Sequence, residues 1–128
     1  MYLKAIWRIG ERREPCRVNS IARVLNIRGP SVVQMLKKLR DRNLVIYNKN
    51  GIKFTDSGQK IGRSVMRNSR LLEVMMESAL KLKIDEELVC GIEHHMNGQF
   101  ADALCTALNH PRRCPHDNDI PAGACCGR

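Results

Sequence analysis

The stretch CGIEH, residues 90–94, places three kinds of metal ligand within five residues. On a helix that turns by about 100° per residue, Cys90, Glu93 and His94 project within about 100° of one another. Glu86, one turn earlier, falls on the same side. This polar group is predicted to lie apart from the main apolar stripe of the helix, which is formed by Leu88, Ile92 and Met96.

A thiolate, a carboxylate and an imidazole together favour a borderline transition ion such as Fe(II), Co(II), Ni(II) or Zn(II). Calcium and magnesium prefer oxygen ligands and are poorly served by this set. One helix offers three ligands, whereas most of these ions take about four to six, so the others must come from another element or from water. Taken singly, Cys90 is typical of a small buried side chain, Glu93 of a surface charge and His94 of a carboxylate's partner. His95, which points elsewhere, is interpreted as structural or exposed.

Four further donors, Cys114, His116, Cys125 and Cys126, lie in the tail. They allow a second metal site, a redox-sensitive thiol cluster, or an ordinary tail with idle thiols. Cys16 and Cys105 are most simply interpreted as packing residues.

The elements that must position these residues follow from apolar periodicity and turn signals. Residues 1–10 are predicted to form a helix, and residues 18–26 a second, with Asn19 or Ser20 as its N-cap. A longer helix over residues 30–44 has Pro30 at its first position, where a missing N–H is tolerated. Two short strands, LVIY (44–47) and IKFT (52–55), flank the hairpin signal NKNG.

The second half is predicted to be helical throughout, apart from its tail. A long helix over about residues 57–82 leads from one half into the next. A helix capped by Asp85 continues through Met96, and a last helix over residues 97–109 is capped by Asn97. The tail is rich in Pro and Gly and lacks periodicity. The fold is therefore expected to be mainly α, with a winged helix-turn-helix in residues 1–63 and a helical unit in residues 64–128.

Helix, tight turn, helix and hairpin is the order of a winged helix-turn-helix, whose second helix enters the major groove of DNA. Residues at the start of that helix can meet base edges, whereas lysines further along it and in the wing suit phosphates. A solvated helix face is the plainer interpretation of any single lysine. The candidates for base contacts are Arg28, Pro30, Ser31 and Gln34, and those for phosphate contacts are Lys37, Lys38, Arg40, Lys49 and Lys53.

The 128 residues carry a formal charge of +9, with a pI of about 9.6, which favours a polyanionic partner such as nucleic acid. No apolar run approaches the ~20 residues of a membrane-spanning helix, and no signal peptide is recognised. We therefore expect a cytoplasmic protein with no membrane partner, whose six cysteines are mostly reduced.

In these features the sequence resembles the diphtheria toxin repressor family, which includes iron-dependent regulators and the manganese transport regulator. The resemblance runs from Met1 to about Pro121. It is carried by MYLKAIW, IARVLNIRGPSVVQMLKKLRDRNLV, FTDSGQKIG, VMRNSRLLE, CGIEHH and CPHDNDIP. It implies a homodimer that represses transcription at palindromic operators when it holds Fe(II) or Mn(II). The helical unit would then serve dimerisation and metal binding.

The resemblance also implies particular residues. The family's primary metal site falls on Met1, Cys90, Glu93 and His94, and Cys90 favours iron because the manganese branch has a carboxylate there. An ancillary site matches at Glu73, but Ser69 and Glu86 stand where the family has histidines. The chain is too short for the SH3-like domain of larger members. The base-reading positions fall on Arg28, Pro30, Ser31 and Gln34.

The leading hypothesis is a metal-activated dimeric repressor with Fe(II) as its effector, although Mn(II), Co(II), Ni(II) or Zn(II) would also fit. The alternative is a thiol-based redox regulator on the same winged helix, with the tail cysteines as sensor. A metal-dependent enzyme is a third possibility, but the sequence offers no separate general base or pocket for an organic substrate. The enzyme hypothesis also leaves the basic first half unexplained, so no enzymatic activity is predicted.

Overall fold

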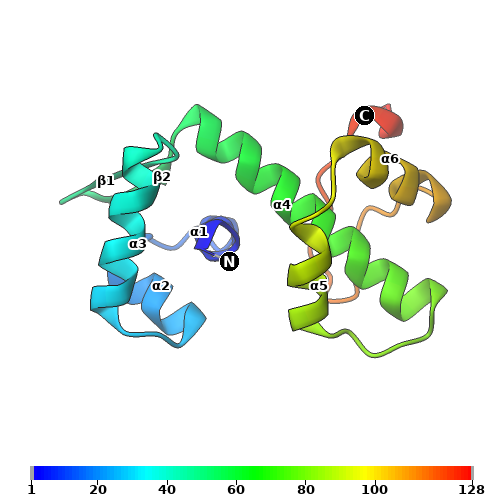
Figure 1. Ribbon diagram of the computed structural model, residues 1–128, viewed down its shortest axis with the longest axis horizontal. Coiled ribbons are helices and arrows are strands. Elements are labelled where there is room, and N and C mark those ends of the chain that lie inside the picture. The colour runs from blue at the N-terminus through cyan, green and yellow to red at the C-terminus, as the bar shows by residue number, and fades with distance from the viewer. Residues whose placement is uncertain (1, 128) are drawn as a thin grey trace. The chain divides into compact units, whose positions relative to one another are not determined.

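The computed structural model describes residues 2–127 and divides into two compact units, one up to Arg63 and the other from Ser64. The element order is α1–α2–α3–β1–β2–α4–α5–α6 (Figure 1). The predicted architecture, mainly helical with a small two-stranded wing, is confirmed. Within the described residues, no helix combines the length and apolar character that a membrane span requires.

The first unit packs three helices and a hairpin around one apolar core. The elements are α1 (Tyr2–Glu11), α2 (Val18–Leu25), α3 (Gly29–Asp41), β1 (Val45–Asn48), β2 (Gly51–Phe54) and the start of α4 (Asp56–Val74). Every element before α4 contributes a side chain to this core, because each carries apolar residues on one face. The core residues are Ala5, Ile6, Ile9, Ile21, Val32, Leu36, Leu39, Val45 and Ile52.

Helix α2 begins at Val18 as predicted, but its N-cap differs from the prediction, and α3 begins one residue early. The N-cap of α2 is Arg17, whose backbone N–H donates to Ser20 Oγ (3.3 Å). Ser20 therefore acts from the third helical residue, and neither Asn19 nor Ser20 is the cap. Helix α3 begins at Gly29, so Pro30 takes its second position, where its missing N–H is equally harmless. This helix ends at Asp41, three residues before the predicted end, because Asn43 adopts a left-handed conformation (φ 61°).

The two strands pair antiparallel, with Val45 opposite Phe54 and Asn48 opposite Gly51. The prediction placed β1 and β2 one residue away from these bounds. Only Lys49 and Asn50 form the loop, and Gly51 has a φ of 121°, which side chains disfavour. The wing is thereby a tight two-residue hairpin.

The second unit consists of the rest of α4, a π-helical turn (Met75–Ala79), α5 (Glu86–Glu93), α6 (Gly98–Ala107) and a 3-10 turn (Ala124–Cys126). One group of buried side chains joins α4 and α6 to the tail through Leu71, Ala101, Cys105, Cys114 and Ile120. Another joins Leu72 and Met76 to Val89 of α5. The prediction of a single long helix to residue 82 is corrected, since α4 ends at Val74 and the π turn that follows it ends at Ala79.

Helix α5 also ends earlier than predicted, at Glu93 rather than Met96. Its predicted cap is confirmed, because Asp85 Oδ1 accepts from the Leu88 N–H at 3.1 Å. The cap of α6 is confirmed as well, with Asn97 Oδ1 accepting from the Phe100 N–H at 2.8 Å. The predicted apolar stripe is wrong at one position, because Leu88 is 48% exposed.

Candidate metal centre and nucleic-acid interface

Helix α3 buries one face and exposes the other. Val32, Leu36 and Leu39 point into the core of the first unit. Because these positions recur every three or four residues, the opposite face is left to solvent. All the residues predicted to contact DNA are exposed, and they lie on that face of α3, at its N-cap or on the wing. They are Arg28, Pro30, Ser31, Gln34, Lys37, Lys38, Arg40, Lys49 and Lys53.

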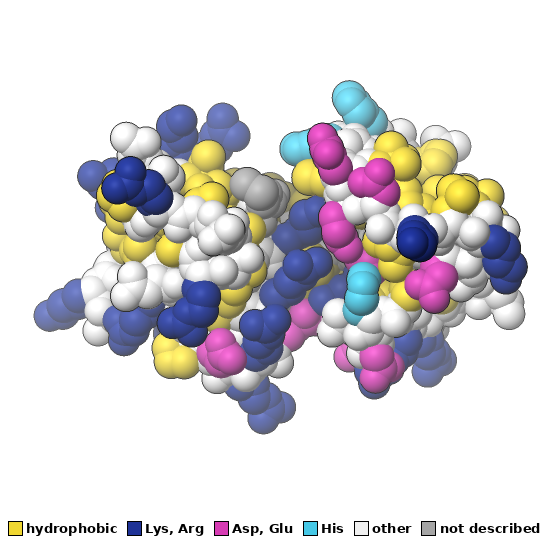
Figure 2. Space-filling model, turned by 90° about the horizontal axis from the view of Figure 1, so that it is seen from below, with side chains coloured by type: hydrophobic (Ala, Val, Ile, Leu, Met, Phe, Trp, Pro, Cys, Tyr) yellow, Lys and Arg dark blue, Asp and Glu magenta, His cyan; other side chains and the backbone are white. Residues whose placement is uncertain are grey.

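The wing is fixed to the segment before α2. The backbone N–H of Ile52 donates to the carbonyl of Cys16 (3.0 Å), and Arg17 Nη1 donates to the carbonyl of Lys49 (3.5 Å). On the face in Figure 2, Lys and Arg side chains predominate over the first unit, whereas several Asp, Glu and His side chains appear over the second. The exposed face of α3 and the wing thus present cations suited to phosphates.

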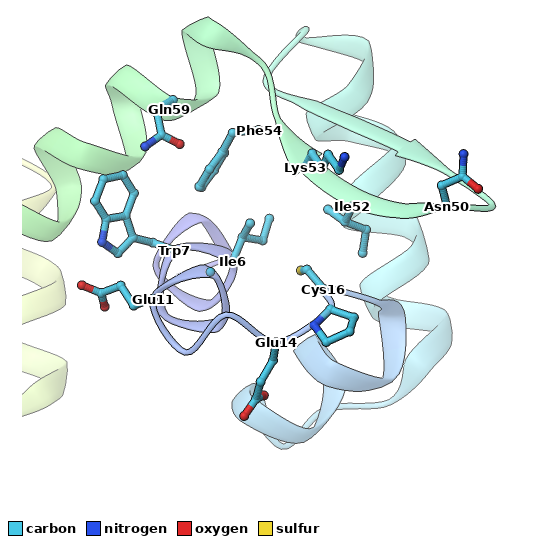
Figure 3. A pocket seen from close by; sticks show the side chains of 12 residues that line it. Ile6, Trp7, Glu11, Glu14, Cys16, Asn50, Ile52, Lys53, Phe54 and Gln59 are labelled. Carbon is cyan, nitrogen blue, oxygen red and sulfur yellow. The ribbon is translucent and has the colours of Figure 1, made fainter.

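A pocket of about 540 Å³ opens beside α1 and the wing (Figure 3). Its walls combine apolar side chains with polar ones such as Glu11 and Lys53, and the Trp7 and Phe54 rings lie 6.3 Å apart across one side. Burial raises the pKa of the Cys16 thiol in its lining to about 11, so this cysteine stays protonated at neutral pH. Cys16 therefore packs, as predicted.

The predicted metal ligands of α5 occupy different environments. Glu93 is buried, Cys90 is half-buried, and His94 is exposed at the C-cap of the helix. Glu93 lies one turn beyond the buried Val89 and shares its face, so the prediction that the polar group avoids the apolar stripe is wrong for this carboxylate. Among the described residues, these three side chains do not form a group whose donor atoms all lie within 4.8 Å of one another.

Of the other predicted ligands, Glu73 and Glu86 lie on different helices. Met1 lies outside the described residues, and Glu86 is exposed at the first residue of α5. Glu73 of α4 is 2% exposed and does belong to a compact donor group. Its partners in that group are Cys114 and His116 of the tail, and Glu86 is not among them.

Glu73, Cys114 and His116 place a carboxylate, a thiol and an imidazole within 4.8 Å of one another. His116 Nδ1 lies 2.7 Å from Glu73 Oε2. Cys114 is buried, whereas half of the His116 side chain is exposed, so the group is anchored inside and open to solvent on one side. The mixed oxygen, sulfur and nitrogen donors fit a divalent transition ion.

The tail reaches Glu73 through a tight loop. The Cys114 N–H donates to the carbonyl of Asn118 (3.0 Å), and the Asp117 N–H donates to the carbonyl of Cys114 (2.9 Å). Arg70, one turn before Glu73 on α4, donates from Nη1 to the carbonyl of Asp119 (2.6 Å). The loop is thus held against the face of α4 that carries Glu73.

A second compact group combines Cys105, His110, Cys125 and Cys126. All six cysteines of the chain are free thiols. A hydrogen bond from the Gly123 backbone, helped by His110 and the neighbouring thiols, lowers the pKa of Cys126 to about 6. Burial raises the pKa of Cys105 to about 11. The tail donors grouped together in the sequence therefore separate into two clusters.

The sequence identified Glu73 but not its partners. The signal that could have found them is CPH, residues 114–116, in which a thiol and an imidazole two residues apart precede turn-forming residues. Cys105 was assigned to packing alone. It does pack, at 1% exposure, but its sulfur also faces His110 and Cys126.

Comparison with known families matches almost the whole chain to the iron-dependent repressors. The N-terminal DNA-binding domain of that family matches residues 1–51. Its metal-binding and dimerisation domain matches residues 55–122. The first match ends at the first residue of β2, and the second begins just before α4.

Individual relatives agree with this result. The chain is 32% identical over 108 residues to the HTH-type transcriptional regulator MntR of Bacillus subtilis (strain 168), covering 80% of this chain and 74% of MntR. The solved structure of the manganese regulator SloR superposes with a TM-score of 0.83 at 35% identity, over 94% of this chain and 58% of SloR. The manganese-activated repressor ScaR, in its apo form, superposes with a TM-score of 0.73 at 33% identity, over 94% of this chain and 59% of ScaR. The chain thus spans little more than half the length of these two solved regulators.

Proposed function

The chain belongs to the iron-dependent repressor family, and from this we propose that it is a metal-dependent transcriptional repressor that binds palindromic operator DNA as a homodimer. Relatives in this family are transcriptional regulators rather than enzymes. We accordingly propose double-stranded DNA and a second copy of the chain as its partners, the cytoplasm as its location, and no organic substrate.

The observation that carries this proposal is the make-up of α4. Its first residues pack in the winged-helix unit, and its last turns bear Glu73, which faces Cys114 and His116. One continuous helix thus belongs both to the domain that would read DNA and to a donor group that would hold an ion. A ligand that binds one arrangement of the two units better than others shifts the population toward it.

In this proposal each set of side chains has one task. Gln34 and its neighbours at the start of α3 read base edges, while Lys37, Lys38 and Lys49 hold phosphates. Cys90, Glu93 and His94, with Met1, are proposed to hold the effector ion. Glu73, Cys114 and His116 are proposed to hold a second one, without Glu86. When bound, an ion supplies coordination free energy that favours the DNA-binding arrangement.

Fe(II) is the effector that the proposed ligands of α5 favour. A thiolate and an imidazole suit Fe(II) better than Mn(II), which prefers carboxylate, carbonyl and water oxygens. SloR is described as a manganese regulator and ScaR as a manganese-activated repressor, so the titration compares Fe(II) directly with Mn(II) on this chain.

The test is a DNA-binding titration of the anaerobically purified protein with Fe(II), Mn(II), Co(II) and Zn(II), combined with elemental analysis. Fe(II) should raise operator affinity at a lower concentration than Mn(II), Co(II) or Zn(II). The affinity should return to its starting value when a chelator is added. Operator affinity that does not change with any of the ions would overturn the proposed function. Activation by Mn(II) at a lower concentration than by Fe(II) would overturn the assignment of iron.

The alternative, a thiol-based redox regulator, draws on the proximity of Cys105, Cys125 and Cys126. It predicts that an oxidant changes operator affinity without added metal. It also predicts that the Cys125→Ser and Cys126→Ser substitutions abolish that response.

A further inference from the structure

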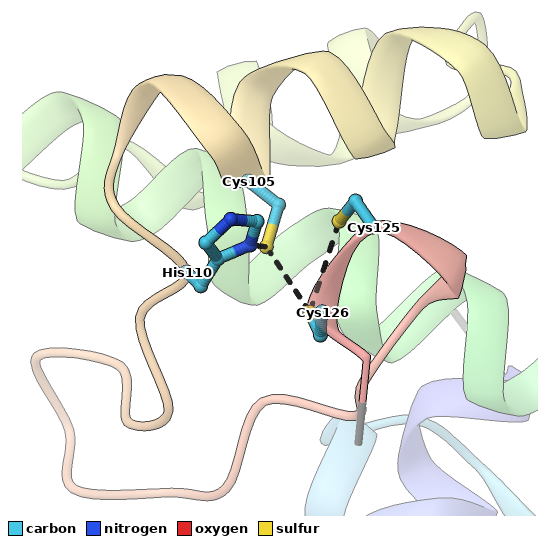
Figure 4. A group of neighbouring side chains, drawn as sticks. All are labelled: Cys105, His110, Cys125 and Cys126. Atoms are coloured by element: carbon cyan, nitrogen blue, oxygen red, sulfur yellow. Dashed lines mark hydrogen bonds between the residues drawn. The ribbon is translucent and has the colours of Figure 1, made fainter.

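The second compact donor group lies where the C-terminal 3-10 turn meets the end of α6 (Figure 4). Cys105 belongs to α6, His110 follows it, and Cys125 and Cys126 belong to the 3-10 turn. All four donor atoms lie within 4.8 Å of one another. Residues 123–127 lie beyond the part matched to the metal-binding domain of the family, so two of the four donors are additional to that domain.

The distances in this group agree with one tetrahedral ion. At the usual zinc–sulfur distance of about 2.3 Å, a tetrahedron places two sulfurs about 3.8 Å apart, and a sulfur and an imidazole nitrogen about 3.6 Å apart. The Sγ atom of Cys126 lies 3.6 Å from that of Cys105 and 3.7 Å from that of Cys125. Cys105 Sγ lies 3.6 Å from His110 Nδ1. Three of the six donor–donor distances therefore match the edges of a coordination tetrahedron, and the other three are no longer than 4.8 Å.

Local backbone structure holds the four donors in place. After α6, Asn109 and His110 adopt positive φ values (65° and 51°), and the His110 N–H donates to the carbonyl of Cys105 at 2.8 Å. This turn brings the imidazole back over the thiol. In the tail, the Cys126 N–H donates to the carbonyl of Gly123 at 3.1 Å, which closes the 3-10 turn that presents both cysteines.

A buried cation accompanies the thiols. Arg67, 6% exposed, donates from Nη2 to Cys125 Sγ at 3.3 Å and pairs through Nη1 with Asp102 Oδ1 at 2.9 Å. Three thiolates and a neutral imidazole around a divalent ion carry one net negative charge, which a neighbouring guanidinium stabilises. Gly123 leaves room for this guanidinium, because a Cβ there would collide with it.

We propose that Cys105, His110, Cys125 and Cys126 form a closed structural site for a thiophilic divalent ion, namely zinc. The bound ion would fix the C-terminal turn to α6. Three cysteines and a histidine are an established set for structural zinc, whereas the effector of a sensor must be exchangeable. Binding releases the thiol protons to solvent and leaves every oxidation state unchanged. This site is independent of the proposed effector sites and of DNA binding.

The experiment uses the full chain under reducing conditions, first stripped of metal and then given zinc alone. Thiols are labelled with a maleimide before and after zinc addition, and the labelled peptides are identified by mass spectrometry. We expect zinc to protect Cys125 and Cys126 from labelling, and Co(II) in its place to give the intense visible bands of tetrahedral thiolate coordination. Unchanged labelling, a disulfide among these cysteines that persists under the reducing conditions, or an iron–sulfur spectrum on purification would each overturn the proposal.

Variants separate this site from the Glu73 group. The Cys125→Ser/Cys126→Ser double variant should lose one zinc equivalent per chain, whereas Cys114→Ser should leave the protection of Cys125 and Cys126 unchanged. His110→Ala should weaken the binding of this zinc ion, because it removes one donor. His110→Cys, which supplies a fourth donor again, should keep the ion bound. Because Cys125 and Cys126 are only half-buried, circular dichroism should show that the helices of the double variant are intact. Equal zinc content in the double variant and the parent would refute the assignment.

Discussion

His116 Nδ1 lies 2.7 Å from Oε2 of Glu73, although the two side chains differ greatly in exposure. The carboxylate is 3% exposed and the imidazole 54%. A buried carboxylate is costly unless a cation or a donor faces it, and here the tail supplies that partner from the solvent side. The contact therefore fixes the tail to α4 and leaves an accessible edge at which an ion can enter.

Replacing Glu73 by Gln should weaken metal binding by the Glu73–Cys114–His116 group by about 10-fold or more, since even outer-shell partners of a metal have that effect. The amide keeps the shape and can still accept a hydrogen bond from His116. We therefore expect the free energy of unfolding of the metal-free protein to change by only about 1 kcal/mol. Isothermal titration calorimetry and urea unfolding measure the two effects.

The matched control for this prediction is Glu87→Gln, because Glu87 is exposed on α5 and belongs to neither donor group. Both variants lose one negative charge, so a general electrostatic effect would weaken binding equally in the two. Equal affinities in Glu73→Gln and the parent protein would exclude Glu73 as a ligand.

The partners of Glu73 could not be predicted from periodicity. His116 lies 43 residues further along the chain, in a segment without a repeating apolar pattern. Its position follows from backbone hydrogen bonds of the 114–118 loop and from Arg70. The CPH motif indicates a possible ligand pair, but it does not say which helix the loop packs against. Position along a helix could be predicted, but contacts between a helix and an irregular tail could not.

Local signals succeeded where the physical cause is itself local. Asp85 and Asn97 were predicted as caps because a side chain three residues from a free N–H satisfies it directly. The π turn after Val74 and the early end of α5 depend on packing and have no such signal. The burial of Glu93 beside Val89 likewise shows that helical angles alone do not decide which face is covered.

His94→Ala should raise the Fe(II) concentration needed for half-maximal operator binding by at least about 10-fold, because it removes a proposed ligand. His95→Ala is the matched control: it removes the same side chain at the next exposed position. Fluorescence anisotropy with labelled operator DNA measures both. A full metal response in His94→Ala, or equal losses in the two variants, would contradict the assigned effector site.

Gln34→Ala should reduce discrimination between operator and mismatched DNA by about 1–3 kcal/mol, because Gln can read a base edge from the exposed face of α3. Lys38→Ala should instead weaken binding to all sequences alike and lower the salt slope by about one. Competition binding at several salt concentrations separates the two effects. Loss of affinity without loss of specificity in Gln34→Ala would show that this residue does not read bases.

Gly58→Ala should destabilise the first unit by about 1–3 kcal/mol, because its Cβ would collide with the backbone carbonyl of Leu44. Gly91→Ala, in α5, should stabilise by about 0.5–1 kcal/mol, since no atom lies within 4 Å of the new Cβ and alanine favours a helix. Urea unfolding followed by circular dichroism provides both values. A neutral Gly58→Ala would mean that α4 does not approach Leu44 this closely.

The stability of the protein should fall between pH 9 and pH 11 in a way that depends on Cys16. Burial raises the pKa of this thiol from 9.0 to about 11 in the folded chain. Below pH 9 the thiol is protonated in both states, so its contribution is constant. As the pH rises from 9 to 11, the unfolded chain releases this proton and the folded chain retains it, which favours unfolding by at most about 1.4 kcal/mol per pH unit.

Cys16→Ala removes this contribution while leaving every other titrating group in place. The difference in unfolding free energy between parent and variant, measured in urea across this range, should therefore change with pH. A constant difference would show that the Cys16 thiol is ionised as readily in the folded chain as in the unfolded one.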